Sequence, residues 1–115
     1  MDDSKMNGHL DALLRVNRVL LSSIIMDLPV PLVQTFLTAA RYEGLTVSEL
    51  NEKIPANRST LSRQLLDLSS TLRDGRPGHG LLTRVPKPDD LRSVMLVLSD
   101  KGKNVMKMIE EAMEA

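Results

Sequence analysis

The sequence predicts a mainly α-helical fold with one small β-hairpin, which places it in the α+β class. Apolar residues recur at helical spacing both before and after residues 81–98, and that stretch itself holds two short β-type runs around a proline-rich turn. The 115 residues fit a single domain, 1–115. With one Phe and one Tyr in the chain, the core must come from aliphatic side chains and Met.

The first predicted helix covers residues 9–27 and is apolar over much of its circumference. Its main stripe recurs at helical spacing and consists of Leu10, Leu13, Leu14, Leu20, Leu21, Ile24 and Leu28. A helix this apolar needs burial on two sides, and a small domain offers one. We therefore expect residues 1–28 to form a dimerisation helix. The alternative is that the rest of the same chain wraps it.

Proline and glycine bound the second predicted helix, residues 31–42. Pro29 and Pro31 break the chain before it, and Gly44 is a natural C-terminal stop. This helix has an apolar stripe that includes Phe36 and Leu37.

A capping box opens the third predicted helix, residues 47–53. Thr46 and Glu49 have the T-x-x-E spacing in which each side chain caps a free amide of the other. Pro55 ends this helix, and Asn57 is a suitable N-cap for a fourth helix from Arg58 to about Leu72. Two short helices joined by a tight turn describe a helix-turn-helix.

The exposed side of the fourth helix carries polar and basic residues, namely Arg58, Ser59, Ser62, Arg63 and Gln64. Arg recognises guanine, Gln recognises adenine, and Ser bonds either a base or a phosphate. Taken alone, such a face is usually solvated surface.

Two β-type runs, residues 81–85 and 93–98, follow the fourth helix, with a hairpin tip at 86–92. A helix-turn-helix followed by a hairpin is a winged helix, here residues 30–99. Ser99 is the expected N-cap of a last helix at 100–115. Its spare apolar surface predicts a second dimer contact.

The charge is unevenly placed along the chain. Residues 53–92 hold eight basic and four acidic side chains, whereas the remainder holds seven basic and eleven acidic ones, so the net charge is zero. A neutral total can therefore conceal a basic face suited to phosphates. The alternative is random clustering of solvated charges.

Several chemistries are excluded by what the sequence lacks. Without cysteine there are no disulfides or thiolate sites, and the two histidines, His9 and His79, have no carboxylate cluster near them in sequence. No phosphate-binding glycine motif or nucleophile–base pair occurs, so we expect no catalytic residue, metal or cofactor. No run of about 18 apolar residues and no signal peptide is present. We expect a cytoplasmic protein with no membrane contact.

From Leu45 onward the sequence resembles the MarR family of winged-helix regulators. The resemblance is carried by five segments: Leu45-Thr46-Val47-Ser48-Glu49-Leu50, Arg58-Ser59-Thr60-Leu61-Ser62-Arg63, Leu81-Leu82-Thr83-Arg84, Pro88-Asp89-Asp90-Leu91-Arg92-Ser93-Val94 and Leu98-Ser99-Asp100-Lys101-Gly102. It implies a homodimer whose recognition helices enter successive major grooves of a near-palindromic site. It also implies that Asp90 orients Arg92 for the minor groove or its phosphates.

The sequence departs from the family pattern at three places. The loop at 73–80 is longer by roughly eight residues on an alignment by eye, and its Arg73, Arg76 and His79 could add backbone contacts. Leu91 stands where the family often has a basic residue, which should weaken wing binding. The chain stops soon after the wing, so an effector pocket near the dimer junction would be missing or reduced.

Together these observations predict a sequence-specific double-stranded DNA-binding transcriptional regulator that acts as a homodimeric repressor and is not an enzyme. The predicted DNA contacts are Arg58, Ser59, Thr60, Ser62, Arg63, Gln64, Arg73, Arg76, Arg84, Lys87, Asp90 and Arg92. Thr60 could instead be half-buried and help to fix the turn. The predicted dimer contacts are Leu10, Leu13, Leu14, Leu20, Leu21, Ile24, Val105, Met106, Ile109 and Met113. The alternative is a winged-helix protein-interaction module with lost or reduced DNA binding. A ligand-sensing regulator is a further alternative: a small-molecule effector is possible, although the sequence gives it no support.

Overall fold

The computed structural model describes residues 3–22, 28–70, 75 and 77–115, which form two compact units. One unit comprises residues 29–103, and the other comprises residues 1–28 together with 104–115. We call them the central unit and the terminal unit.

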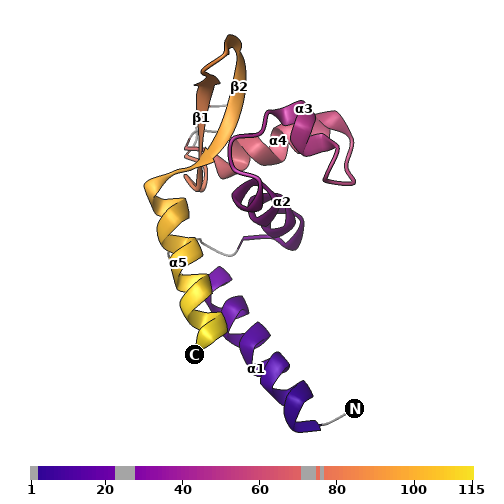
Figure 1. Ribbon diagram of the computed structural model, residues 1–115, viewed down its shortest axis with the longest axis vertical. Coiled ribbons are helices and arrows are strands. Elements are labelled where there is room, and N and C mark those ends of the chain that lie inside the picture. The colour runs from indigo at the N-terminus through magenta and orange to yellow at the C-terminus, as the bar shows by residue number, and fades with distance from the viewer. Residues whose placement is uncertain (1–2, 23–27, 71–74, 76) are drawn as a thin grey trace. The chain divides into compact units, whose positions relative to one another are not determined.

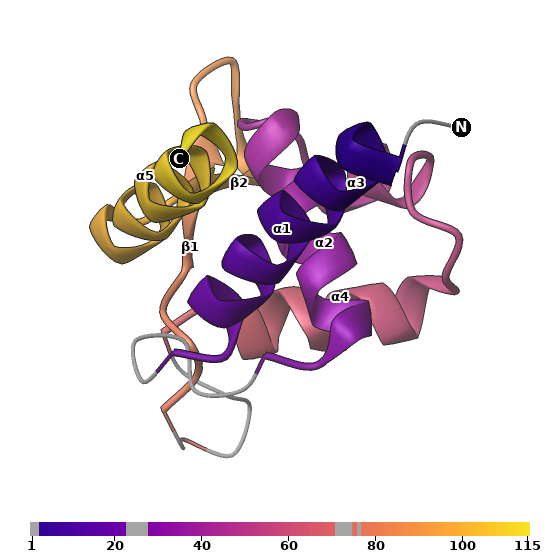
Figure 2. The ribbon, with the colours of Figure 1, turned by 90° about the horizontal axis from the view of Figure 1, so that it is seen from below.

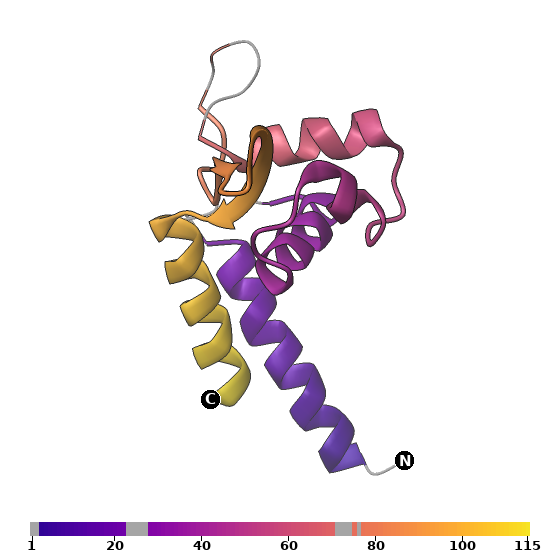
Figure 3. The ribbon, with the colours of Figure 1, turned by 45° about the horizontal axis from the view of Figure 1, so that its top comes forward.

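The central unit contains three helices and a hairpin: α2 (Val30–Arg41), α3 (Val47–Asn51), α4 (Arg58–Leu68), β1 (Leu82–Lys87) and β2 (Asp90–Leu98). Helix α2 crosses α4 and packs against it (Figure 2), and it also packs against β2. The hairpin lies beside the C-terminal end of α4 (Figure 3). This is the mainly helical, single-hairpin fold that the sequence predicts.

Local capping signals in the sequence are confirmed. The Thr46 N–H donates to Glu49 Oε1 at 3.0 Å, and the Glu49 N–H donates to Thr46 Oγ1, which completes the capping box of α3. Asn57 Oδ1 accepts the Thr60 N–H at 2.8 Å and begins α4. Gly44 ends the turn after α2 with φ of 96°, a left-handed conformation that glycine adopts without strain.

Helix α4 ends at Leu68, not near Leu72 as predicted, and Leu72 lies outside the described residues. Ser69 is extended, and its hydroxyl donates back to the Leu65 carbonyl. The chain then returns to this helix end, so that four carbonyls of residues 67–70 accept N–H groups of residues 78–81. Two of these bonds satisfy the terminal carbonyls of the helix, those of Asp67 and Leu68, and the set connects the helix end to the segment that leads into β1.

Both strands extend further into the wing tip than predicted. Lys87 pairs with Asp90, so the turn is only Pro88 and Asp89, and a bulge leaves residues 91–93 of β2 without partners in β1. A third extended segment, absent from the prediction, joins this sheet. Thr46 forms an antiparallel bridge with Met95, and the Leu96 N–H donates to the Leu45 carbonyl.

The other helix bounds also differ from the predicted ones. Helix α3 is two residues shorter, because the chain after Asn51 tightens into turns that donate to the Glu49 and Leu50 carbonyls. Helix α2 is displaced by one residue at each end, a common uncertainty for helix bounds.

The core of the central unit is aliphatic around one phenylalanine. Its fully or almost fully buried side chains include Phe36, Leu50, Leu61, Leu65, Leu68, Leu81, Leu82 and Leu96. The apolar face of α4 therefore points inward, and its other side is left for solvent or a partner.

The terminal unit contains α1 (Asp3–Leu20) and most of α5 (Asp100–Glu114), which begins in the central unit. The two helices lie side by side within this unit (Figure 1), and Arg15 Nε donates to the Ala112 carbonyl at 2.6 Å. Helix α1 begins at residue 3, not residue 9, because Asp3 stabilises a polar first turn that apolar periodicity does not report. It ends at Leu20, and residues 23–27 of the predicted helix lie outside the described residues. None of the described helices is both long and apolar enough to cross a membrane.

Gly102 allows α5 to begin directly against Leu81, the residue before β1. Ser99 caps the helix by accepting the Gly102 N–H at 3.0 Å, as predicted. A Cβ at position 102 would stand 2.1 Å from the Leu81 carbonyl oxygen, which also accepts the Ser99 N–H. The contact is with backbone, so no side-chain rotation relieves it.

We therefore expect Gly102→Ala to lower the free energy of unfolding by about 1–3 kcal/mol, as overpacking does. Gly8→Ala is the matched control, because Gly8 is also helical and a Cβ there meets nothing within 4 Å. That substitution should stabilise the chain by about 0.5–1 kcal/mol through helix propensity. Urea denaturation measures both variants. Equal stabilisation by the two substitutions would contradict the close approach at Gly102.

Candidate nucleic-acid interface

The outward face of α4 centres on two side chains one turn apart. Ser59 and Arg63 are exposed, opposite the buried Leu61 and Leu65, and Ser62 is half-buried beside them. Because residues i and i+4 lie on one face of a helix, Ser59 and Arg63 project in the same direction.

The turn before α4 uses several of the predicted contact residues for its own hydrogen bonds. Arg58 Nη1 donates to Ser48 Oγ at 2.9 Å and thereby ties α4 to α3. The Ser59 hydroxyl donates to Asn57 Oδ1 at 2.8 Å and keeps its lone pairs as acceptors. Thr60 is half-buried and gives its N–H to the Asn57 cap, which agrees with a role in fixing the turn.

Gln64 does not lie on the outward face. It is half-buried, and its Oε1 accepts the hydroxyl of Thr35 on α2 at 2.7 Å. Recognition of adenine requires both the amide oxygen and the amide nitrogen of Gln. Thr35 uses one of the two lone pairs of that oxygen and the side chain is half-buried, so the role of Gln64 as a base reader stays a prediction.

Arg92 lies in the bulge of β2 near the wing tip, residues 91–93. The Asp90 carboxylate accepts the Arg92 N–H at 3.2 Å and the Ser93 hydroxyl at 2.9 Å. Asp90 therefore contacts the backbone N–H of Arg92. The family resemblance implied that Asp90 orients the Arg92 side chain, and that role stays a prediction. Arg92 and Leu91 are both exposed, with Leu91 at 77 %.

Lys87 lies at the end of β1, within electrostatic reach of the capping box. Hydrogen bonds from the Thr46 N–H and the Thr46 hydroxyl lower the pKa of Glu49, and the charge of Lys87 lowers it further.

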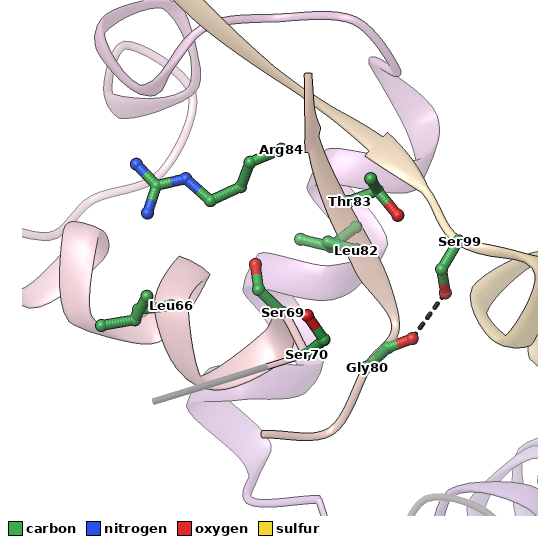
Figure 4. A pocket seen from close by; sticks show the side chains of 8 residues that line it. All are labelled: Leu66, Ser69, Ser70, Gly80, Leu82, Thr83, Arg84 and Ser99. Atoms are coloured by element: carbon green, nitrogen blue, oxygen red, sulfur yellow. Dashed lines mark hydrogen bonds between the residues drawn. The ribbon is translucent and has the colours of Figure 1, made fainter. Parts of the chain in front are cut away.

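A shallow groove of about 270 Å³ separates the C-terminal end of α4 from β1 (Figure 4). Arg84 extends across it from β1 towards α4. Two of the lining hydroxyls are already committed, Ser69 to the Leu65 carbonyl and Ser99 to the Gly80 carbonyl. Arg84 is exposed and remains the main charged group of the groove.

Two predicted loop contacts, Arg73 and Arg76, lie outside the described residues, as does Ile24 of the predicted dimer surface. Across the ranges that the structure describes, no three His, Cys, Asp or Glu side chains gather as a metal site.

The predicted dimer residues divide into exposed and buried groups. Helix α1 has no buried side chain; its Leu10, Leu13 and Leu14 are exposed and its Leu20 is half-buried, while Leu21, just after the helix, is exposed. On α5, Met113 is 61 % exposed and Met106 is half-buried. Val105 and Ile109 are buried within the single chain, and their part in a dimer contact stays a prediction.

Comparison with protein-family models gives no match, and comparison with curated protein sequences gives none either. Solved structures, in contrast, match along nearly the whole chain, and they define the class as winged helix-turn-helix. A MarR-like transcriptional regulator from Thermotoga maritima is 25% identical with a TM-score of 0.68, over 99% of this chain and 77% of that chain.

Two further matches are structures with DNA. FabT of Streptococcus pneumoniae in complex with DNA is 22% identical with a TM-score of 0.62, over 96% of this chain and 73% of that chain. A MarR mutant from E. coli complexed with operator DNA is 20% identical with a TM-score of 0.62, over 90% of this chain and 69% of that chain. The MarR-like winged-helix fold predicted from the sequence is confirmed.

Proposed function

We propose that this protein is a sequence-specific double-stranded DNA-binding transcriptional regulator. The observation that carries the proposal is the pair of exposed arginines in the central unit, Arg63 on α4 with the polar Ser59 beside it, and Arg92 on the wing. An α-helix fits the major groove, where Arg bonds two acceptors of guanine. An Arg on a wing suits phosphates or a narrow minor groove.

The neighbouring structures support the same use of the fold. FabT and the E. coli MarR mutant share it and are seen with DNA. In this chain the helix that corresponds by position to a recognition helix has its apolar side buried and Arg63 outward.

We further propose that the protein acts as a homodimer and as a repressor. The exposed leucines of α1, with Leu13 at 65 %, supply apolar surface that a second copy would cover. A two-fold dimer presents two α4 helices to successive major grooves of a near-palindromic site. Repression would result where the bound site overlaps one that other proteins need, because bound protein excludes them from the same DNA.

The test is selection of bound duplexes from random DNA, followed by affinity measurement across a salt series. We expect half-sites about 10 base pairs apart and a log affinity that falls linearly with log salt concentration. Light scattering after size exclusion should report a dimer. If no duplex is retained at low salt, the proposal is wrong. Nuclease-insensitive capture of a protein partner would then favour the interaction module.

A further inference from the structure

Thr35 is an exception in the core of the central unit. Among the described residues only Thr35 and Ser69 are polar and buried, and Thr35 is fully buried. The Ser69 hydroxyl donates to the Leu65 carbonyl, at the end of the helix that Ser69 follows. Thr35 instead reaches another helix, since its hydroxyl lies 2.7 Å from Gln64 Oε1 and 3.2 Å from the carbonyl of Pro31 on α2.

This hydrogen bond joins α2 to α4 beside the proposed reading face. Gln64 follows Arg63 directly, on the edge of α4 between the buried leucines and the outward face. Contacts of the buried leucines are close-packed but individually non-directional, so they define the roll of the helix less sharply than a directional contact does. A hydrogen bond is directional and weakens steeply when its geometry is lost. The Thr35–Gln64 bond therefore helps to fix the roll of α4 midway along the helix, between the Arg58–Ser48 bond at its start and the backbone bonds at its end.

Small changes of roll matter at the reading face. Side chains extend about 5–6 Å from a helix axis, so a roll of about 20° displaces their ends by about 2 Å. A bidentate bond between Arg and guanine does not survive such a displacement. The roll of α4 thus decides whether Ser59 and Arg63 meet base edges.

We propose that Thr35 and Gln64 are positioning residues that set sequence specificity without touching a base. This inference rests on the proposed function. It assigns to Gln64 the role of an anchor for α4. It also assigns a functional role to Thr35, a residue that the sequence alone does not single out.

The test compares Thr35→Val with a matched control, Thr38→Val. Thr38 lies on the same helix and donates its hydroxyl to the Gln34 carbonyl at 2.7 Å, a bond local to α2. Affinities are measured for a duplex selected by the unmodified protein and for a scrambled duplex of equal length. We expect Thr35→Val to weaken the selected duplex about three- to tenfold, from the net value of one hydrogen bond. The scrambled duplex, the salt dependence and Thr38→Val should show no change.

Thr35→Ser restores the hydroxyl and should restore the preference. Gln64→Met removes the acceptor from a half-buried position and should reproduce Thr35→Val even if the latter is unstable. A base-pair scan separates anchoring from reading, because loss of the anchor relaxes the same base pairs as Arg63→Ala.

Three results would overturn the inference. Unchanged preference in both Thr35→Val and Gln64→Met would show that the bond does not set specificity. Relaxation at a single base pair in Gln64→Met alone would make Gln64 a reader. Failure of the unmodified protein to retain any duplex would overturn the proposed function together with this inference, and that result is visible before any variant is made.

Discussion

Phe36→Ala is expected to lower the free energy of unfolding by about 3–5 kcal/mol, the usual range for a buried Phe. Phe36 is the only phenylalanine of the chain and is fully buried in α2, the helix that packs against both α4 and β2. Truncation leaves a cavity between these elements that an aliphatic core fills only partly. Because α2 supports α4, binding of DNA should be lost along with stability.

Leu37→Ala is the control for this experiment. Leu37 is adjacent on α2 but 38 % exposed, so its truncation should cost much less than that of Phe36. Urea or thermal denaturation compares the two variants with the unmodified chain. Similar losses from both variants would show that Phe36 is not the centre of the core.

Elements governed by neighbouring residues could be predicted from the sequence. The capping box of Thr46 and Glu49 and the caps at Asn57 and Ser99 each depend on bonds spanning three residues. The same reasoning failed at the end of α4, where the terminal carbonyls bond to residues 78–81 across a loop. Nothing near Leu68 in sequence signals that return of the chain.

The candidate site also has a part that could be predicted from the sequence and a part that could not. Helical periodicity places Ser59 and Arg63 outward because Leu61 and Leu65 must face the core. Periodicity does not reveal that Gln64 has a partner, since Thr35 is 29 residues away in sequence. It also cannot distinguish an apolar side chain buried in its own chain, such as Val105, from one left exposed, such as Leu13.

Arg63→Ala should weaken binding to a selected duplex by about 1–3 kcal/mol, roughly 5- to 150-fold, if Arg63 reads guanine in the major groove. Arg63 is exposed on the outward face of α4, so its truncation removes recognition and leaves the core intact. The loss should be concentrated at one base pair of each half-site. Replacing that guanine in the duplex should abolish the difference between the two proteins.

Arg41→Ala is the charge-matched control for Arg63→Ala. Arg41 is also exposed in the central unit, at the end of α2, where its guanidinium stacks on the Tyr42 ring at 4.8 Å. It should reduce affinity for every duplex slightly and equally. Arg92→Ala provides a second comparison, because a wing contact with phosphates should weaken all sequences by a similar, larger factor. Equal effects of Arg63→Ala on selected and scrambled duplexes would show that Arg63 contacts only the backbone, and the specificity of α4 would then have to come from Ser59 and Ser62.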